Sequence, residues 1–95
     1  MLTTNDLPRS ALIVLDRLKA EGPLSPKEIA ARACLPPRTV SFALRKLIRQ
    51  RLCCKIPNLR DMRQPLYQLD YDRFQELRQV IDRLRIQAGL HSRAI

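Results

Sequence analysis

The chain has 95 residues, of which 45% are hydrophobic, so it has the size and composition of one small folded domain. Its longest apolar run, residues 11–15, is far shorter than the about 20 residues that a membrane-spanning helix needs. The composition therefore excludes a disordered chain and a membrane-spanning one, and the first ten residues lack a secretion leader, so we expect a cytoplasmic protein.

The cysteines and the histidine argue against a disulfide framework and a metal site. The three cysteines are Cys34, Cys53 and Cys54, an odd number with two adjacent. The one histidine, His91, lies far along the chain, so too few ligands are present for zinc. A glycine-rich phosphate loop and a nucleophile with a nearby base are also missing from the sequence. We expect no metal, no cofactor and no enzymatic activity.

Positive charge is concentrated in the middle of the chain. The formal net charge is +9, and residues 38–63 account for +7 of it, with eight basic residues against Asp61. Clustering of this kind is typical of a surface that binds a polyanion, whereas a merely solvated basic face is the alternative. The basic residues are Arg38, Arg45, Lys46, Arg49, Arg51, Lys55, Arg60 and Arg63.

Two helices are predicted before this segment. The first spans residues 8–21, with Pro8 in its first turn and Gly22 after its end. The second spans residues 25–34, where Ser25 and Glu28 have the spacing of a capping box.

A third helix is predicted over residues 37–50. It follows a short turn with two prolines, Pro36 and Pro37, at its end. Its outward face includes Phe42, for which we favour packing against a neighbouring element over contact with a ligand. Apolar residues at spacings of three and four predict an inward stripe, formed by Val40, Leu44, Leu47 and Ile48.

The rest of the chain predicts a β-hairpin and one more helix. Residues 52–56 and 66–69 have the composition of strands, and the segment 57–65 between them is polar and bounded by prolines. A final helix of residues 70–88 has a heptad-like seam, formed by Phe74, Leu77, Ile81, Leu84 and Ala88. The predicted fold is mostly α with a small β-hairpin (α+β), in the order α-α-α-β-β-α.

This order resembles the winged helix-turn-helix domains of prokaryotic transcription regulators, above all the MarR and ArsR groups, with TrmB-like archaeal regulators close behind. The resemblance covers about residues 10–70 and rests on two strings. "LSPKEIAARACLPPRTVSFALRKLIRQRL" is similar to the family's helix-turn-helix, and "KIPNLRDMRQPLYQL" resembles the MarR wing, in which an Asp-x-Arg sequence lies near the tip.

The resemblance implies roles for individual residues. The helix 37–50 would read the major groove of DNA, and the wing 57–65 would enter the adjacent minor groove. Arg63 takes the role of the wing arginine, with Asp61 orienting it and Arg60 assisting. Base and phosphate contacts of the helix fall on Arg38, Thr39, Ser41, Phe42, Arg45, Lys46 and Arg49.

Three features differ from the family or leave alternatives open. Arg51 stands where these families usually have glycine, so either it is left-handed or the helix ends differently. Paired cysteines on the recognition helix, typical of metal-sensing ArsR proteins, are missing. Cys53 and Cys54 lie at the first wing strand, and two roles are open for them. They are small apolar residues, or they form a redox switch in which Lys55 and Arg51 lower a thiol pKa.

We interpret residues 1–95 as a single domain, with a DNA-binding lobe of residues 8–69 and a C-terminal helix of residues 70–90. The last helix is predicted to form a homodimer, and packing on the first helix of the same chain is the alternative. No residue marks a site for a small-molecule effector. The predicted dimer contacts are Phe74, Leu77, Ile81 and Leu84.

The predicted function is sequence-specific binding of double-stranded DNA as a transcriptional regulator. The alternatives are a winged-helix module for RNA or protein contacts in a transcription or replication assembly, and a non-specific architectural DNA binder. Aromatic residues make up only 4% of the chain, which disfavours single-stranded RNA bound by base stacking.

Overall fold

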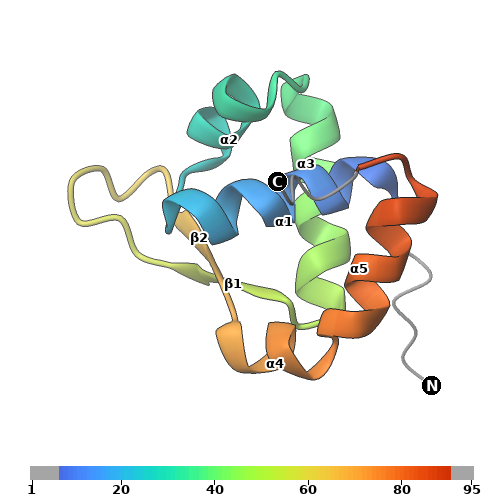
Figure 1. Ribbon diagram of the computed structural model, residues 1–95. Coiled ribbons are helices and arrows are strands. Elements are labelled where there is room, and N and C mark those ends of the chain that lie inside the picture. The colour runs from blue at the N-terminus through green and yellow to red at the C-terminus, as the bar shows by residue number, and fades with distance from the viewer. Residues whose placement is uncertain (1–6, 91–95) are drawn as a thin grey trace.

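The computed structural model of the chain describes residues 7–90, and within this range it consists of five helices and a two-stranded antiparallel hairpin that lies at one side of them (Figure 1). This arrangement confirms the predicted α+β winged-helix fold. The elements in chain order are α1 (Arg9–Glu21), α2 (Pro26–Ala33), α3 (Pro37–Arg49), β1 (Cys53–Ile56), β2 (Leu66–Leu69), α4 (Tyr71–Glu76) and α5 (Arg78–Gln87).

The predicted capping box starts α2. The Ser25 hydroxyl accepts a hydrogen bond from the Glu28 backbone N–H (3.2 Å), and the Glu28 carboxylate accepts one from the Ser25 backbone N–H (2.9 Å). At the other end of α2, Cys34 is left-handed (φ 56°), and the Leu35 N–H bonds to the Ala30 carbonyl (3.1 Å). Only residues 34–36 separate α2 from α3, which confirms the short turn.

The core lies where α1 crosses α3. Most of the inward face of α1 is buried, and the hydrophobic residues of α3 that join it are Val40, Ala43, Leu44 and Leu47. The predicted stripe was wrong at one position, because Ile48 is 40% exposed. Each helical residue advances by about 100°, so Ala43 completes the inward face and Ile48 lies beyond its edge.

Arg51 is left-handed (φ 62°), which is the first of the two alternatives that the sequence left open. Its backbone N–H bonds to the Ile48 carbonyl (2.9 Å), and the Leu52 N–H bonds to the Leu47 carbonyl (2.9 Å). These bonds satisfy carbonyl groups at the end of α3. They also turn the chain so that Leu52 enters the core, with no exposed surface.

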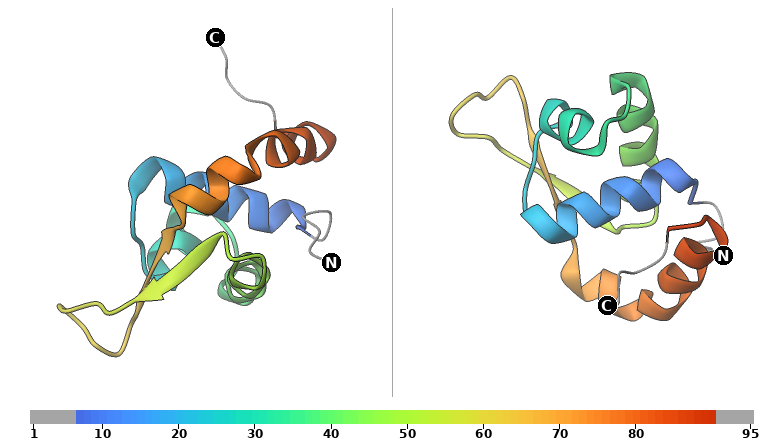
Figure 2. Two further views of the ribbon diagram at one scale, coloured as in Figure 1. Left: turned by 90° about the horizontal axis from the view of Figure 1, so that it is seen from below. Right: turned by 45° about the horizontal axis from the view of Figure 1, so that its top comes forward.

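The hairpin is fastened to the helical part of the domain beside α2. Its strands pair from Cys53 opposite Leu69 to Ile56 opposite Leu66. Leu24, just before α2, exchanges two backbone hydrogen bonds with Tyr67 of β2 (3.0 and 2.8 Å). Figure 2 shows that the loop of residues 57–65 projects away from the helices.

The predicted single C-terminal helix is instead two helices, α4 and α5, with a break at Leu77 (φ −107°, ψ 10°). After the break, α5 runs beside α1 (Figures 1 and 2), where the Arg85 guanidinium lies 3.2 Å from the Asp16 carboxylate. Leu77 and Leu84 pack against the core of the same chain, and Phe74 and Ile81 are buried in it. The seam predicted for dimer contacts is therefore used within the chain.

Replacing Arg51 with glycine is expected to stabilise the protein by about 0.5–1 kcal/mol, since a residue with a Cβ atom is strained in the left-handed region. Arg49→Gly is the matched control, because it removes the same charge from a residue in right-handed helix and should destabilise by about 0.5–1 kcal/mol. Urea unfolding of both variants measures the two changes in the free energy of unfolding. Equal destabilisation would contradict strain at Arg51.

Candidate nucleic-acid interface

The outer face of α3 holds the residues predicted to contact DNA. Thr39 and Lys46 are partly covered, and the exposed residues are Arg38, Ser41, Phe42, Arg45 and Arg49. The Phe42 side chain is 41% exposed. Packing against a neighbouring element, which the sequence favoured, would cover more of it. The Lys46 ammonium lies 5.4 Å from the centre of its ring, a cation–π distance along the same helix.

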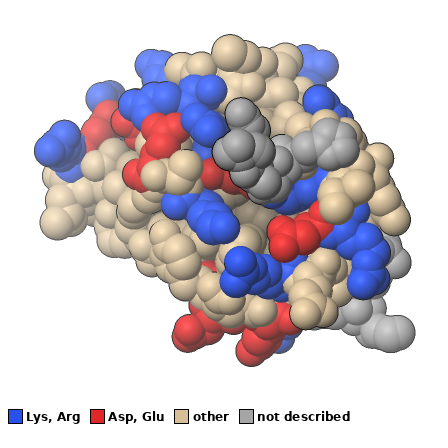
Figure 3. Space-filling model, in the orientation of Figure 1, with Lys and Arg blue, Asp and Glu red and all other residues tan. Residues whose placement is uncertain are grey.

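The charges of α3 are not used to hold the fold together. Within residues 7–90, the basic side chains of this helix form no ion pair with an acidic residue, whereas Arg17 of α1 and Arg32 of α2 both pair with Glu21. Figure 3 shows acidic side chains at the lower edge of the molecule, where α4 carries Asp72 and Glu76. Positive charge on α3 therefore remains available to an anionic partner.

In the wing, Asp61 and Arg63 are joined by hydrogen bonds and an ion pair. One oxygen of the Asp61 carboxylate accepts hydrogen bonds from the backbone N–H (3.1 Å) and the Nε (3.2 Å) of Arg63. These bonds are the main cause of a pKa of Asp61 below its ordinary value. The Arg63 side chain is still 89% exposed, so the carboxylate orients it without covering it. Contact of Arg63 with DNA stays a prediction.

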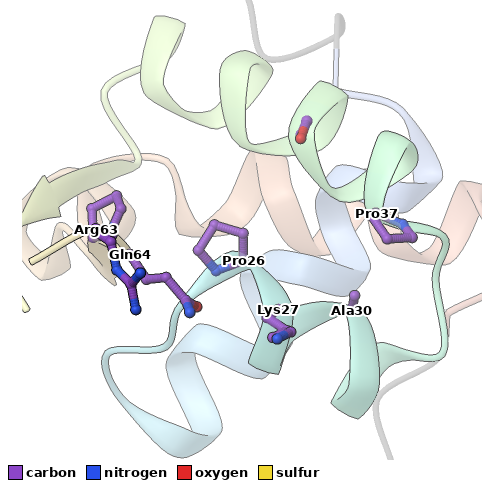
Figure 4. Close-up of a pocket in the computed structure, with 8 residues that line it drawn as sticks. Pro26, Lys27, Ala30, Pro37, Arg63 and Gln64 are labelled. Atoms are coloured by element: carbon purple, nitrogen blue, oxygen red, sulfur yellow. The ribbon is translucent and has the colours of Figure 1, made fainter. Parts of the chain in front are cut away.

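A hollow of about 370 Å³ lies between α2, the start of α3 and the wing (Figure 4). The prediction from sequence missed Lys27, which lines this hollow from α2 and acts electrostatically on Asp61 of the wing. No motif marks Lys27, because only the folded chain brings α2 beside the wing. The lining residues are Pro26, Lys27, Ala30, Pro37, Ser41, Arg63, Gln64 and Pro65.

The alternation of the first wing strand buries Cys53, which is 4% exposed, and exposes Cys54. Burial, together with the neighbouring Cys54, raises the pKa of the Cys53 thiol to about 12. Lys55 and Arg51 therefore do not make Cys53 a reactive thiolate, which removes the basis for a redox role of this residue. Cys53 is instead a small apolar residue of the core.

Among the described residues there is no cluster of His, Cys, Asp and Glu side chains that could hold a metal ion, and His91 lies outside the described range. No helix within residues 7–90 is long and apolar enough to cross a membrane.

Several solved structures have the same fold. The YusO protein from Bacillus subtilis is 26% identical, with a TM-score of 0.65 over 82% of this chain and 57% of its own. The PcaV transcriptional regulator from Streptomyces coelicolor is 25% identical, with a TM-score of 0.70 over 90% of this chain and 60% of its own. The MarR-family transcription regulator SP03579 is 20% identical, with a TM-score of 0.69 over 85% of this chain and 52% of its own.

The chain thus spans little more than half the length of these structures. No protein-family model matches the sequence, and no curated protein matches it. PcaV and SP03579 are transcription regulators.

We expect iodoacetamide to alkylate Cys34 and Cys54 in the folded protein and Cys53 only after unfolding, which mass spectrometry of the peptides would show.

The raised pKa of Cys53 also affects the stability of the protein at high pH. Above about pH 9 the Cys53 thiol ionises in the unfolded chain but not in the folded one, so the free energy of unfolding should fall by up to about 1.4 kcal/mol per pH unit. Cys53→Ala is the reference that lacks this contribution. Rapid alkylation of Cys53 in the native state would contradict its burial.

The helix-turn-helix of α2 and α3, the hairpin wing beside it and the likeness to these structures lead to one conclusion. The chain has the winged helix-turn-helix fold of MarR-like transcription regulators.

Proposed function

We propose that this protein binds double-stranded DNA sequence-specifically and regulates transcription, with α3 in the major groove and the wing in the minor groove. One observation carries the proposal. The basic side chains on the exposed face of α3 have no acidic partner among residues 7–90. A protein whose fold leaves this charge unpaired on one helix is suited to a polyanion, and transcription regulators with the same fold support DNA as that polyanion.

The residues of α3 divide into two groups by their chemistry. Arg38 and Arg45 can each donate two hydrogen bonds to a guanine, and the hydroxyl groups of Thr39 and Ser41 can bond to bases or phosphates. The ring of Phe42 is exposed and can contact a thymine methyl group. Lys46 and Arg49 lie further along the helix and are assigned to phosphate groups.

The hollow beside the wing could receive the phosphate backbone that separates two neighbouring grooves of DNA. A major and a minor groove that lie side by side on a duplex are separated by a phosphate backbone. With α3 in one groove and the wing in the other, that backbone would lie over the hollow, between Lys27 and Arg63. Lys27 is therefore added to the proposed phosphate contacts, and Arg60 supports Arg63 at the wing.

We also propose that the protein acts as a homodimer in the cytoplasm, since two recognition helices about 34 Å apart would read one turn of DNA. Phe74 and Ile81 are buried within the chain, so they are not available to a second copy. Ile86 on α5, which is 61% exposed, is a better candidate for the dimer contact.

Selection from a pool of random double-stranded DNA tests the function. We expect enrichment of a palindrome whose half-sites lie about ten base pairs apart. Binding without enrichment, falling steeply as salt is raised, would instead indicate a non-specific architectural binder. No binding at all would contradict the proposal and favour a module for RNA or protein contacts.

On a selected duplex, Arg45→Ala is expected to weaken binding by about 1–3 kcal/mol and to relax the preference at one base pair, because a bidentate contact with guanine is lost. Arg83→Ala is the matched control, since Arg83 is also exposed but lies on α5. Titrations monitored by fluorescence anisotropy on the selected duplex and its single-base variants give both quantities. Equal loss of affinity on every sequence would assign Arg45 to a phosphate.

A further inference from the structure

The loop of the wing contains the same structural unit twice. Asn58-Leu59-Arg60 and Asp61-Met62-Arg63 each begin a tight turn, closed by hydrogen bonds from the Asp61 N–H to the Asn58 carbonyl (3.2 Å) and from the Gln64 N–H to the Asp61 carbonyl (3.0 Å). In each unit the first side chain accepts a hydrogen bond from the backbone N–H of the arginine, at 3.1 Å in both cases. The two units therefore present their apolar residue and their arginine in equivalent positions.

The apolar residues of these two units are the most exposed large hydrophobic residues in the described part of the chain. Leu59 is 86% exposed and Met62 is 70% exposed. A single exposed leucine on a protein surface needs no explanation. Two of them, each at the corner of a turn and each followed by an arginine, form a repeated surface that contributes almost nothing to the core.

We propose that Leu59 and Met62 enter the minor groove as apolar wedges that partly unstack adjacent base pairs and bend the duplex. This inference rests on the proposed function, because it places the wing on DNA. It goes further in assigning the contact to the two apolar side chains as well as to Arg63. Proteins that bend DNA from the minor groove commonly use leucine or methionine in this way.

The charges around the tip favour DNA as the occupant over a second copy of the chain or another protein. Arg60 and Arg63 follow the two wedges directly and can reach the phosphates or the floor of the groove on either side. Another copy of this chain, with a net charge of +9, would repel such a tip. The turns and the ion pair between Arg63 and Asp61 hold the loop before it binds, which reduces the ordering that binding requires.

Insertion of the two wedges would add a preference for certain base-pair steps, and this preference needs no hydrogen bond to a base. Pyrimidine–purine steps such as TA unstack and kink most easily, so the wing should favour them at its own position on the duplex. The recognition helix would determine the bases of the major groove, and the wedges would determine where the duplex can bend.

The test compares DNA bending and affinity in the full chain. The probe is a duplex from the selection, or an A·T-rich duplex if no sequence is enriched, with a fluorescence donor and acceptor at its ends so that energy transfer reports the bend. The double variant Leu59→Ser and Met62→Ser should bind about tenfold more weakly or worse and should bend the duplex less, since apolar surface is no longer buried. The control Leu59→Met and Met62→Leu keeps both wedges apolar and should retain the bend and the affinity. Circular dichroism verifies that each variant is folded.

Arg63→Ala separates the wedges from the charge beside them. It should weaken binding and reduce its dependence on salt while most of the bend remains, because the two wedges are still present. If the serine variant binds and bends the duplex as the unchanged protein does, the inference is wrong and the proposed function stands. If the unchanged protein does not bind DNA, both fail together. A serine variant that alters the sedimentation of the free protein would assign the tip to a second copy and overturn the inference.

Discussion

The left-handed conformation of Arg51 determines how the recognition helix is joined to the wing. With a φ of 62°, Arg51 turns the chain away from α3, which ends at Arg49, and Leu52 after it is buried in the core. The Leu52 carbonyl then accepts a hydrogen bond from the Asp70 N–H (2.9 Å), so both ends of the hairpin are held at this point. This turn therefore sets the angle between α3 and the wing. That angle decides whether both elements could enter neighbouring grooves of one duplex.

A second link between the helices and the wing lies at the other end of β2. The backbone bonds between Leu24 and Tyr67 join the start of α2 to the hairpin. The capping box at Ser25 follows at once and sets the direction of α2. With both links in place, α2, α3 and the wing form the walls of one hollow, and Lys27 and Arg63 come to the same surface although they are far apart in the sequence.

The charged residues fall into two groups. Some connect elements of the fold, and others are exposed and form no ion pair within residues 7–90. Arg85 connects α5 to Asp16 of α1, and the Arg73 Nε donates to the Gln50 carbonyl at the end of α3 (3.1 Å). The first pair holds α5 on α1, and the second bond holds the start of α4 against the end of α3. The basic residues on the outer face of α3 have no such role, which is why a contact with an anionic partner explains their position better than stability does.

The local sequence determined the first three helices, the two strands and the turns between them. Proline and capping residues act within a few positions of themselves, so the starts of α2 and α3 could be predicted, and the alternation of a strand placed one of Cys53 and Cys54 inside. Side chains at helical spacing likewise identified the outer face of α3. Three features depended on the tertiary structure: the break at Leu77, the use of Phe74 and Ile81 within the chain, and the position of Lys27 beside the wing. A heptad-like pattern states only that one face is apolar, and the element that covers this face is determined by long-range packing.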